Sequence, residues 1–149
     1  MLTARDIMNS EVITITEEST VKELARILAI HQISGVPVIN DKGKLVGVVT
    51  ESDLIYQTKK VHIPTVITIL DSVFYLENPD KMGDEMKKMA GTKVKDILTS
   101  SPVTVTEDTP LDEIATIMAE KNMHTLPVVN KGGLVGVIGK KDIIRTLID

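Results

Sequence analysis

The sequence predicts an α+β fold made of two copies of one strand–helix–strand–strand–helix unit. The first reason is an internal repeat, in which ordered blocks of residues return at an offset of about 90 positions. The second is the alternation of apolar and polar residues in short runs such as residues 13–16, which is typical of half-buried strands. The third is the helical spacing of apolar residues between those runs.

The repeat consists of four blocks that occur in the same order in both halves. Residues 4–8, 12–17, 36–40 and 45–48 match residues 94–98, 102–107, 126–130 and 134–137, with a one-residue deletion in the second copy. Because the order and spacing are kept, chance is a poor explanation for these matches. The chain therefore divides into a first repeat at 1–55, a helical insert or linker at 56–93 and a second repeat at 94–149.

A short strand and a capped helix open each copy. Ser19 or Thr20 is placed to cap the first of these helices, and Glu23 follows Thr20 at the spacing of a capping box. In the second copy Thr109 is the expected cap, with Pro110 at the first helical position. The apolar faces of the two helices are formed by Val21, Leu24, Ala25 and Leu28, and by Leu111, Ile114, Ala115 and Met118.

A β-hairpin follows in each copy. Residues 36–39 and 45–49 are rich in β-branched side chains and flank an Asn/Asp/Gly turn at 40–43, which favours a hairpin. Pro37 and Pro127 lack the N–H that a β-ladder needs. We therefore expect each proline at the start of a strand or on the edge of its sheet.

The junction between the first hairpin and its closing helix has the features of a ligand-binding turn. The helix should begin near Ser52, with Thr50 as its cap and Asp53 at the third helical position. Unpaired N–H groups in a first helical turn favour anions such as phosphate. The carboxylate of Asp53 can accept two hydrogen bonds, which suits the adjacent hydroxyls of a ribose. The alternative is that Thr50 and Asp53 only cap the helix. The junction returns at residues 136–142, with its helix beginning near Lys141.

The insert has no counterpart in the second copy. Its first part shows a helical period, with Pro64 at the first turn and apolar residues Ile63, Val66, Ile67, Leu70, Val73 and Phe74. A second short helix is expected at 80–91, a polar stretch with three methionines that ends at Gly91. The insert either packs on the core of the repeats or offers its apolar face as a lid or subunit contact.

Composition excludes several classes of function. A net charge of −4 and a pI near 5.4 argue against binding to a phosphate backbone, and only 2% of residues are aromatic for base stacking. The absence of cysteine excludes disulfides, thiol catalysis and cysteine-ligated metals. No signal-peptide core and no apolar run of about 18 residues is present, so we expect a cytoplasmic protein that makes no contact with membranes.

Signals of catalysis are missing as well. His31, His62 and His124 are isolated, and none is at metal-ligand spacing from another histidine. Neither a G-x-S-x-G nucleophile motif nor a P-loop occurs. The sequence therefore predicts a protein that is not an enzyme, with no catalytic residues and no metal site.

The ordered duplicate resembles a tandem pair of cystathionine-β-synthase (CBS) domains, also called a Bateman module. The motifs that carry the resemblance are the strand at 13–15 with its capped helix, residues 34–38, residues 47–53, and their equivalents in the second copy. The resemblance covers residues 4–55 and 94–149 and does not include the insert. It implies two β-α-β-β-α units related by a pseudo-twofold axis and packed through their sheets. It also implies two clefts between the units and a disc-like homodimer.

The function implied by this resemblance is regulatory. CBS pairs bind adenosyl ligands in their clefts, such as AMP, ADP, ATP or S-adenosylmethionine, and sometimes NAD or a cyclic dinucleotide. Binding then signals, through the geometry between the repeats or within the dimer, to a separate effector protein. No permanently bound cofactor and no nucleic acid partner is expected. The alternative is a structural dimerisation module that binds no ligand.

Seven residues form the first cleft that the resemblance implies: Thr50, Ser52, Asp53, Leu98, Val103, Met123 and His124. Asp53 would bind the ribose hydroxyls, with Thr50 and Ser52 near the phosphate or sugar. Leu98 and Val103 would line the base, and the backbone around the remaining two residues would read its edge.

The second cleft implied by the resemblance contains Met8, Ile13, Ile33, Ser34, Lys141 and Asp142. Asp142 would bind the ribose. This cleft departs from the family pattern, because Gly139 and Lys141 replace the hydroxyl residues found at the first junction. Either Lys140 or Lys141 would meet a polyphosphate, or both are solvated surface lysines. These departures favour the first cleft as the ligand site.

Overall fold

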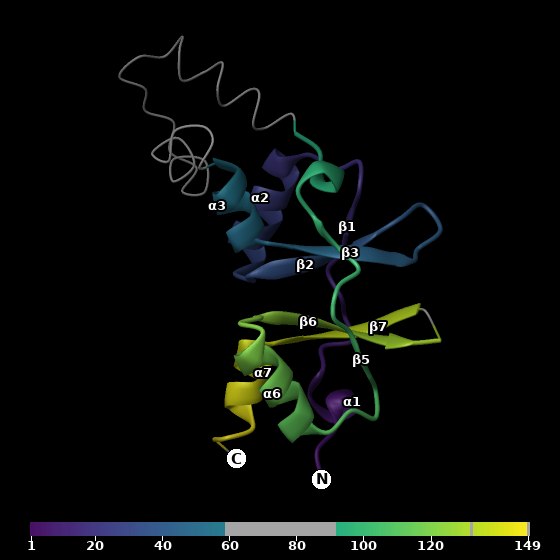
Figure 1. The fold of residues 1–149 in the computed structure, drawn as a ribbon, viewed down its shortest axis with the longest axis vertical. Helices are drawn as coiled ribbons and strands as arrows, with labels where there is room; N and C mark the ends of the chain where they lie inside the picture. The colour runs from purple at the N-terminus through teal and green to yellow at the C-terminus, as the bar shows by residue number, and fades with distance from the viewer. Residues whose placement is uncertain (59–91, 132, 149) are drawn as a thin grey trace.

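A computed structural model describes residues 1–58, 92–131 and 133–148 of the 149-residue chain. The two repeats form two units stacked along the long axis, with their sheets facing each other and their helices on the outer faces (Figure 1). This arrangement confirms the predicted α+β fold of two units packed through their sheets. The two helices predicted in the insert lie outside the described residues.

The first unit contains β1 (Ile15–Thr16), α2 (Val21–His31), β2 (Gly35–Ile39), β3 (Leu45–Thr50) and α3 (Glu51–Thr58). The second unit contains β5 (Val105–Thr106), α6 (Leu111–Glu120), β6 (Thr125–Asn130), β7 (Gly133–Gly139) and α7 (Lys140–Arg145). In each unit the short first strand is parallel to the second, which is antiparallel to the third. Strands β2 and β6 contact each other across the two units.

Local sequence signals account for the elements of the first unit. Thr20 caps α2, and its hydroxyl accepts the N–H of Glu23 at 3.2 Å. In the hairpin turn, Oδ1 of Asn40 accepts the N–H groups of Lys42 and Lys44 at 2.9 and 3.0 Å. Gly43 has a φ of 78°, a conformation that favours glycine. The predicted helix cap and hairpin are therefore confirmed.

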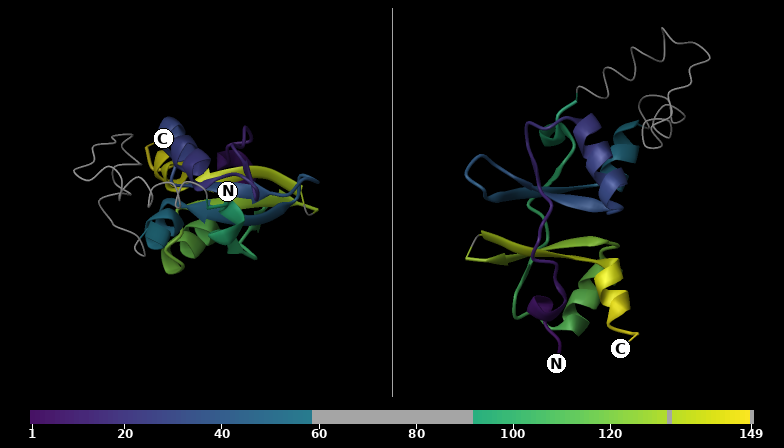
Figure 2. Two further views of the ribbon diagram at one scale, coloured as in Figure 1. Left: turned by 90° about the horizontal axis from the view of Figure 1, so that it is seen from above. Right: turned by 180° about the vertical axis from the view of Figure 1, so that it is seen from behind.

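The opening segment of each repeat packs on the opposite unit. Helix α1 (Ala4–Ile7) lies in the second unit, where Ala4 is fully buried in the core. The 3-10 helix η1 (Val94–Asp96) lies in the first unit, and the next strand, β4 (Thr99–Ser100), pairs with β3. The chain crosses from one unit to the other twice, between α1 and β1 and again between β4 and β5 (Figure 2). Each hydrophobic core thus contains residues from both repeats.

Two details of the sequence prediction are wrong. Helix α6 is capped by Pro110 rather than Thr109, because the Thr109 hydroxyl bonds to the N–H and hydroxyl of Thr106 in the preceding turn, at 3.1 and 3.2 Å. Pro37 and Pro127 are neither at the start of their strands, β2 and β6, nor in an edge strand. Since β1 and β5 pair only with the two residues that follow each proline, the missing N–H removes no bond to these short strands.

Candidate functional site

The first junction combines a helix cap with a carboxylate oxygen that remains available. Oδ2 of Asp53 accepts the Thr50 N–H at 2.9 Å and the Thr50 hydroxyl at 3.2 Å. The Asp53 N–H is 3.3 Å from Oγ1 of Thr50, which completes the predicted capping box. Within the described part of the chain, Oδ1 of Asp53 has no hydrogen-bond or ion-pair partner. One oxygen therefore caps α3 and the other can accept a bond from a ligand.

The opening segment of the second repeat lies directly against this junction strand. Strand β4 pairs with β3 so that Thr99 is opposite Val48. A Cβ added to Gly47 would lie 2.6 Å from the carbonyl oxygen of Thr99 and 2.7 Å from Cδ1 of Leu98. Glycine at position 47 is therefore required for this close approach. Leu98 is thereby packed against β3, the strand that ends at Thr50.

A contact between β2 and β6 brings the second repeat to the same place. The hydroxyls of Ser34 and Thr125 are 3.2 Å apart. A Cβ on Gly35 would lie 2.7 Å from Oγ1 of Thr125 and 3.0 Å from Cγ2 of Thr50. Thr125 and Thr50 are therefore neighbours across the interface between the units.

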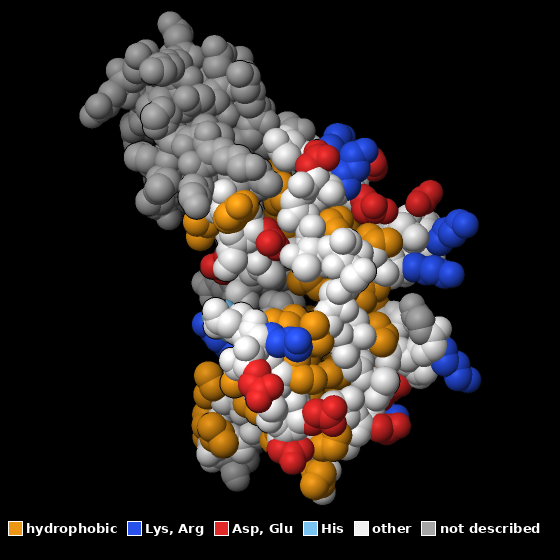
Figure 3. Space-filling view, in the orientation of Figure 1, with side chains coloured by type: hydrophobic (Ala, Val, Ile, Leu, Met, Phe, Trp, Pro, Cys, Tyr) orange, Lys and Arg blue, Asp and Glu red, His pale blue; other side chains and the backbone are white. Residues whose placement is uncertain are grey.

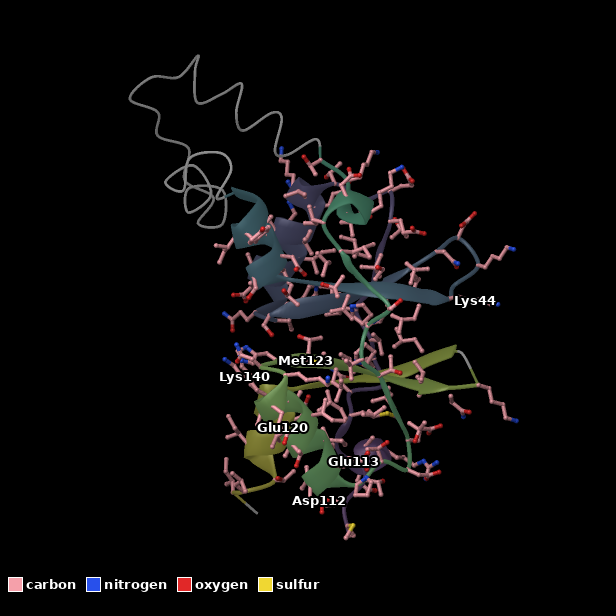
Figure 4. The ribbon with its side chains drawn as sticks, viewed as in Figure 1. Lys44, Asp112, Glu113, Glu120, Met123 and Lys140 are labelled. Atoms are coloured by element: carbon pink, nitrogen blue, oxygen red, sulfur yellow. The ribbon has the colours of Figure 1, made fainter. Side chains whose placement is uncertain are left out.

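Two predicted residues immediately precede Thr125 and so lie near the first junction. Met123 is half-buried and packs against the core of the second unit, whereas His124 is exposed. Met123 and Lys140 lie at the level where the two units meet (Figure 4). The turn that should read the base edge is thus adjacent to the junction that should bind the ribose.

At the second junction the carboxylate is occupied on both oxygens. Oδ2 of Asp142 accepts the Gly139 N–H at 2.7 Å, and Oδ1 is 3.5 Å from Nη1 of Arg145. Gly139 offers no hydroxyl, and Lys141 is exposed. Asp142 therefore has fewer free acceptor positions than Asp53 has.

The opening segment of the first repeat covers this second junction strand. Asn9 and Val137 exchange two backbone hydrogen bonds, at 2.9 and 3.0 Å. Any side chain at Gly136 would collide with Met8, which holds Met8 against β7 in the way that Leu98 is held against β3. The two junctions are thus related by the pseudo-twofold axis.

The remaining predicted residues lie at the margins of the two cores. Ile13 and Ile33 are half-buried and pack against the first core, while Val103 packs against the second. In each predicted base pocket, residues from both units are therefore represented. Ser52 is exposed on the first turn of α3.

Sequence reasoning missed two residues near the candidate site. Thr125 is buried at the contact between the units, and Arg145 pairs with Asp142. The three-residue spacing from Asp142 to Arg145 on one helix was the available signal for that ion pair. For Thr125 there was no local signal, because its partner Ser34 is 91 residues away.

A polar groove of about 340 Å³ lies elsewhere, at the edge of the second unit. Its charged side chains largely bind one another: Arg5 is 3.3 Å from Glu107 and 3.5 Å from Asp108, and Asn130 donates to Glu107 at 2.8 Å. In the described ranges, no three His, Asp or Glu side chains come together as they would around a metal ion. None of the helices there has the length and apolar character needed to cross a membrane.

A model of the CBS domain matches residues 4–59 and again residues 94–149. The chain belongs to the CBS domain family. As a tandem CBS pair, it is 32% identical to an uncharacterized protein of Methanocaldococcus jannaschii, over 97% of this chain and 90% of that protein.

Solved structures of other CBS pairs have the same fold. The CBS domain pair of protein MJ0100, crystallised with 5′-methylthioadenosine and S-adenosyl-L-methionine, is 26% identical with a TM-score of 0.70, covering 99% of this chain and 96% of that one. CBSX2 of Arabidopsis thaliana, crystallised with AMP, is 24% identical with a TM-score of 0.73, covering 99% and 97% of the two chains.

Proposed function

We propose that this CBS pair is a regulatory module that binds an adenosyl ligand at the Thr50–Asp53 junction. The observation that carries the proposal is the available Oδ1 of Asp53, next to the first turn of α3 and within reach of residues from both units. The MJ0100 pair was crystallised with 5′-methylthioadenosine and S-adenosyl-L-methionine, which supports a ligand of the adenosyl class for this chain. AMP in CBSX2, which has the same fold, points to the same class.

Each residue of the first cleft has a role in this proposal. Asp53 accepts the ribose hydroxyls, and charge-assisted bonds of this type contribute about 1.5–3 kcal/mol each. The hydroxyl of Ser52 and the N–H groups at the start of α3 meet the 5′ substituent of the ligand. Leu98 and Val103 cover the faces of the base, and the backbone at residues 123–124 binds its edge.

The second cleft binds more weakly in this proposal. Arg145 already holds Oδ1 of Asp142, and a ligand must displace it to reach both oxygens. The lysines at positions 140 and 141 are exposed and would favour a ligand with several phosphates.

Signalling follows from the position of the cleft between the two units. A ligand that contacts both units binds most tightly to one inter-unit angle and raises the population of that state. The change in angle is then read by a separate effector protein. The module itself performs no chemistry.

A thermal-shift panel of AMP, ADP, ATP, S-adenosylmethionine, 5′-methylthioadenosine and NADH tests the proposal. A ligand at 100 times its dissociation constant adds about 2.7 kcal/mol, which for a chain of this size is on the order of 10 °C. Because a ten-fold weaker site would keep about 1.4 kcal/mol of this stabilisation, Asp53→Ala should reduce the shift by about half or more. Asp142→Ala is the matched control, since it removes the equivalent cap in the second unit, and it should leave the shift in place. Each shift is compared with the ligand-free variant, because both substitutions also remove a helix cap.

A ligand-free dimerisation module is the second candidate. It is favoured by the large apolar side chains exposed on α3 and on the chain from α7 onward: Ile55, Ile144, Leu147 and Ile148. No thermal shift with any compound of the panel, together with a stable dimer, would support this candidate over the nucleotide sensor.

A further inference from the structure

The first turn of α3 has few backbone N–H groups left for an anion. The N–H of Glu51 donates to the carbonyl oxygen of Ser34 at 2.9 Å. The N–H of Asp53 donates to Oγ1 of Thr50 at 3.3 Å. Among the described residues, Ser52 therefore carries the remaining first-turn N–H. Since phosphate binding at a helix start depends on several free N–H groups together, the start of α3 is a poor partner for a phosphate.

The side chains of this turn are acidic as well. Glu51 and Asp53 lie in the first turn, and the helix Glu51–Thr58 contains no lysine or arginine. Glu51 is exposed, and within the described ranges it has no ion-pair partner. A carboxylate without a partner attracts a cation and repels an anion that is placed near it. The electrostatics of this turn therefore favour a positive ligand group over a negative one.

Glu51 lies beside the place that the proposed ligand gives to its 5′ substituent. In the proposed function Asp53 holds the ribose and Ser52 meets the 5′ substituent, and Glu51 directly precedes Ser52 on α3. Acidic side chains border the level where the units meet next to α3, and basic side chains border it on the side of the second unit (Figure 3). Lys140, which takes the position of Glu51 in the second repeat, lies on that second side (Figure 4). The unit that would hold the ribose thus presents the acidic side.

We propose that Glu51 makes the first cleft select adenosyl ligands by the charge of their 5′ substituent, in favour of a cation over a phosphate. The sulfonium and ammonium groups of S-adenosylmethionine are attracted by the Glu51 carboxylate. The thioether of 5′-methylthioadenosine carries no charge, and the phosphate of AMP is repelled. This inference deepens the proposed function and rests on it, because it requires an adenosyl ligand held by Asp53.

Calorimetric titration with these three ligands tests the selection, because they share adenosine and differ at the 5′ carbon. An Asp142→Ala background keeps the contribution of the second cleft small. In this background S-adenosylmethionine should bind most tightly and AMP least tightly. Glu51→Gln should lower the ratio of the AMP dissociation constant to that of S-adenosylmethionine by about five-fold, because it removes one attraction and one repulsion.

Two further variants sharpen the test. Glu51→Lys should lower the ratio further than Glu51→Gln does, and Lys140 at the start of α7 shows that a lysine fits at the equivalent position. Glu113→Gln is the matched control, because Glu113 is an exposed acid near the outer end of α6 (Figure 4). This control should leave the ratio as it is in the Asp142→Ala protein.

The results that overturn this inference differ from those that overturn the proposed function. If all three ligands bind and neither Glu51 variant changes the ratio, the selection by Glu51 is wrong and the adenosyl site remains. AMP binding more tightly than S-adenosylmethionine in the Asp142→Ala protein would also overturn it. So would a ratio that responds to Lys121→Gln, at the exposed C-cap of α6, and not to the Glu51 variants. Absence of binding by all three ligands would contradict the proposed function itself, and the inference with it.

Discussion

The two aspartates at the junctions differ in what they already bind. Asp53 uses one oxygen to cap α3, while Asp142 has one oxygen on the Gly139 N–H and the other near Arg145. The position equivalent to Arg145 in the first unit is Tyr56, which cannot form that ion pair. Arg145 thus adds another difference between the two junctions, besides Gly139 and Lys141 in place of Thr50 and Ser52.

Removing the arginine should improve binding at the second cleft. The Arg145 side chain is 71% exposed, so its ion pair with Asp142 is of the weak surface kind. In an Asp53→Ala background, Arg145→Gln should tighten binding of 5′-methylthioadenosine by about 2–5-fold. This ligand has no phosphate for the arginine to bind instead. Arg26→Gln on α2, also at an exposed arginine, is the control, and calorimetry is the measurement. Weaker binding after Arg145→Gln would show that the arginine contacts the ligand.

A third aspartate, Asp6, makes stability depend on pH. The backbone N–H and the hydroxyl of Thr3 donate to Asp6 and lower the pKa of its carboxyl below the usual value. A carboxyl with a lowered pKa in the folded state stabilises that state above the unfolded pKa of about 3.9 and loses the effect as the pH falls. The stability difference between wild type and Asp6→Asn, from urea unfolding, should therefore be largest above about pH 5 and shrink below pH 4. If the unfolding free energies of wild type and Asp6→Asn differed by the same amount at every pH in this range, the role of Asp6 would be contradicted.

At the scale of elements, the repeats are joined by exchanged opening segments rather than by a simple face-to-face contact. Helix α1 completes the second core, and η1 with β4 completes the first. The approach of β4 to β3 depends on the absence of a side chain at Gly47. This contact also places Leu98 where the proposed first cleft would lie, so the packing of β4 and the proposed lining of that cleft both depend on Gly47.

Gly47→Ala should disrupt this contact. The added Cβ would lie 2.6 Å from a backbone oxygen of Thr99, which cannot move without displacing β4. Overpacking of this kind costs about 1–3 kcal/mol of unfolding free energy. Gly133→Ala is the matched control, because its nearest neighbour, an oxygen of Asn130, is at an ordinary 3.5 Å. Denaturant midpoints should fall for Gly47→Ala alone, with faster amide exchange at β4, and equal midpoints for the two variants would count against the role of Gly47.

The sequence was sufficient for the elements whose signals are local. The cap at Thr20, the Asn40 turn and the Thr50–Asp53 box each depend on side chains within four residues of their partners. The predicted cap of α6 is one residue too early. Thr109 is the counterpart of Ser19, and its hydroxyl forms a hydrogen bond with Thr106 in the preceding turn, as that of Ser19 does with Thr16. The repeat alignment itself places Pro110 opposite Thr20 and would have corrected the error.

On the scale of the whole molecule, the pseudo-twofold axis sets the geometry and the sequence breaks its symmetry. The backbone gives two similar junctions, but one begins an acidic helix and the other a basic one. No local pattern indicates which segments exchange between the units, because the backbone pairings involved join residues far apart in the sequence, from Val48 with Thr99 to Asn9 with Val137.

The central claim is that one adenosyl ligand binds at the first junction through Asp53. Calorimetric titration of wild type, Asp53→Ala and Asp142→Ala with S-adenosylmethionine, and separately with AMP, tests it most directly. The account predicts that Asp142→Ala retains the tighter site, whereas Asp53→Ala weakens that site by about ten-fold or more, as loss of a charge-assisted hydrogen bond requires. Tight binding that survives in Asp53→Ala and disappears in Asp142→Ala, or the absence of binding by wild type, would contradict it.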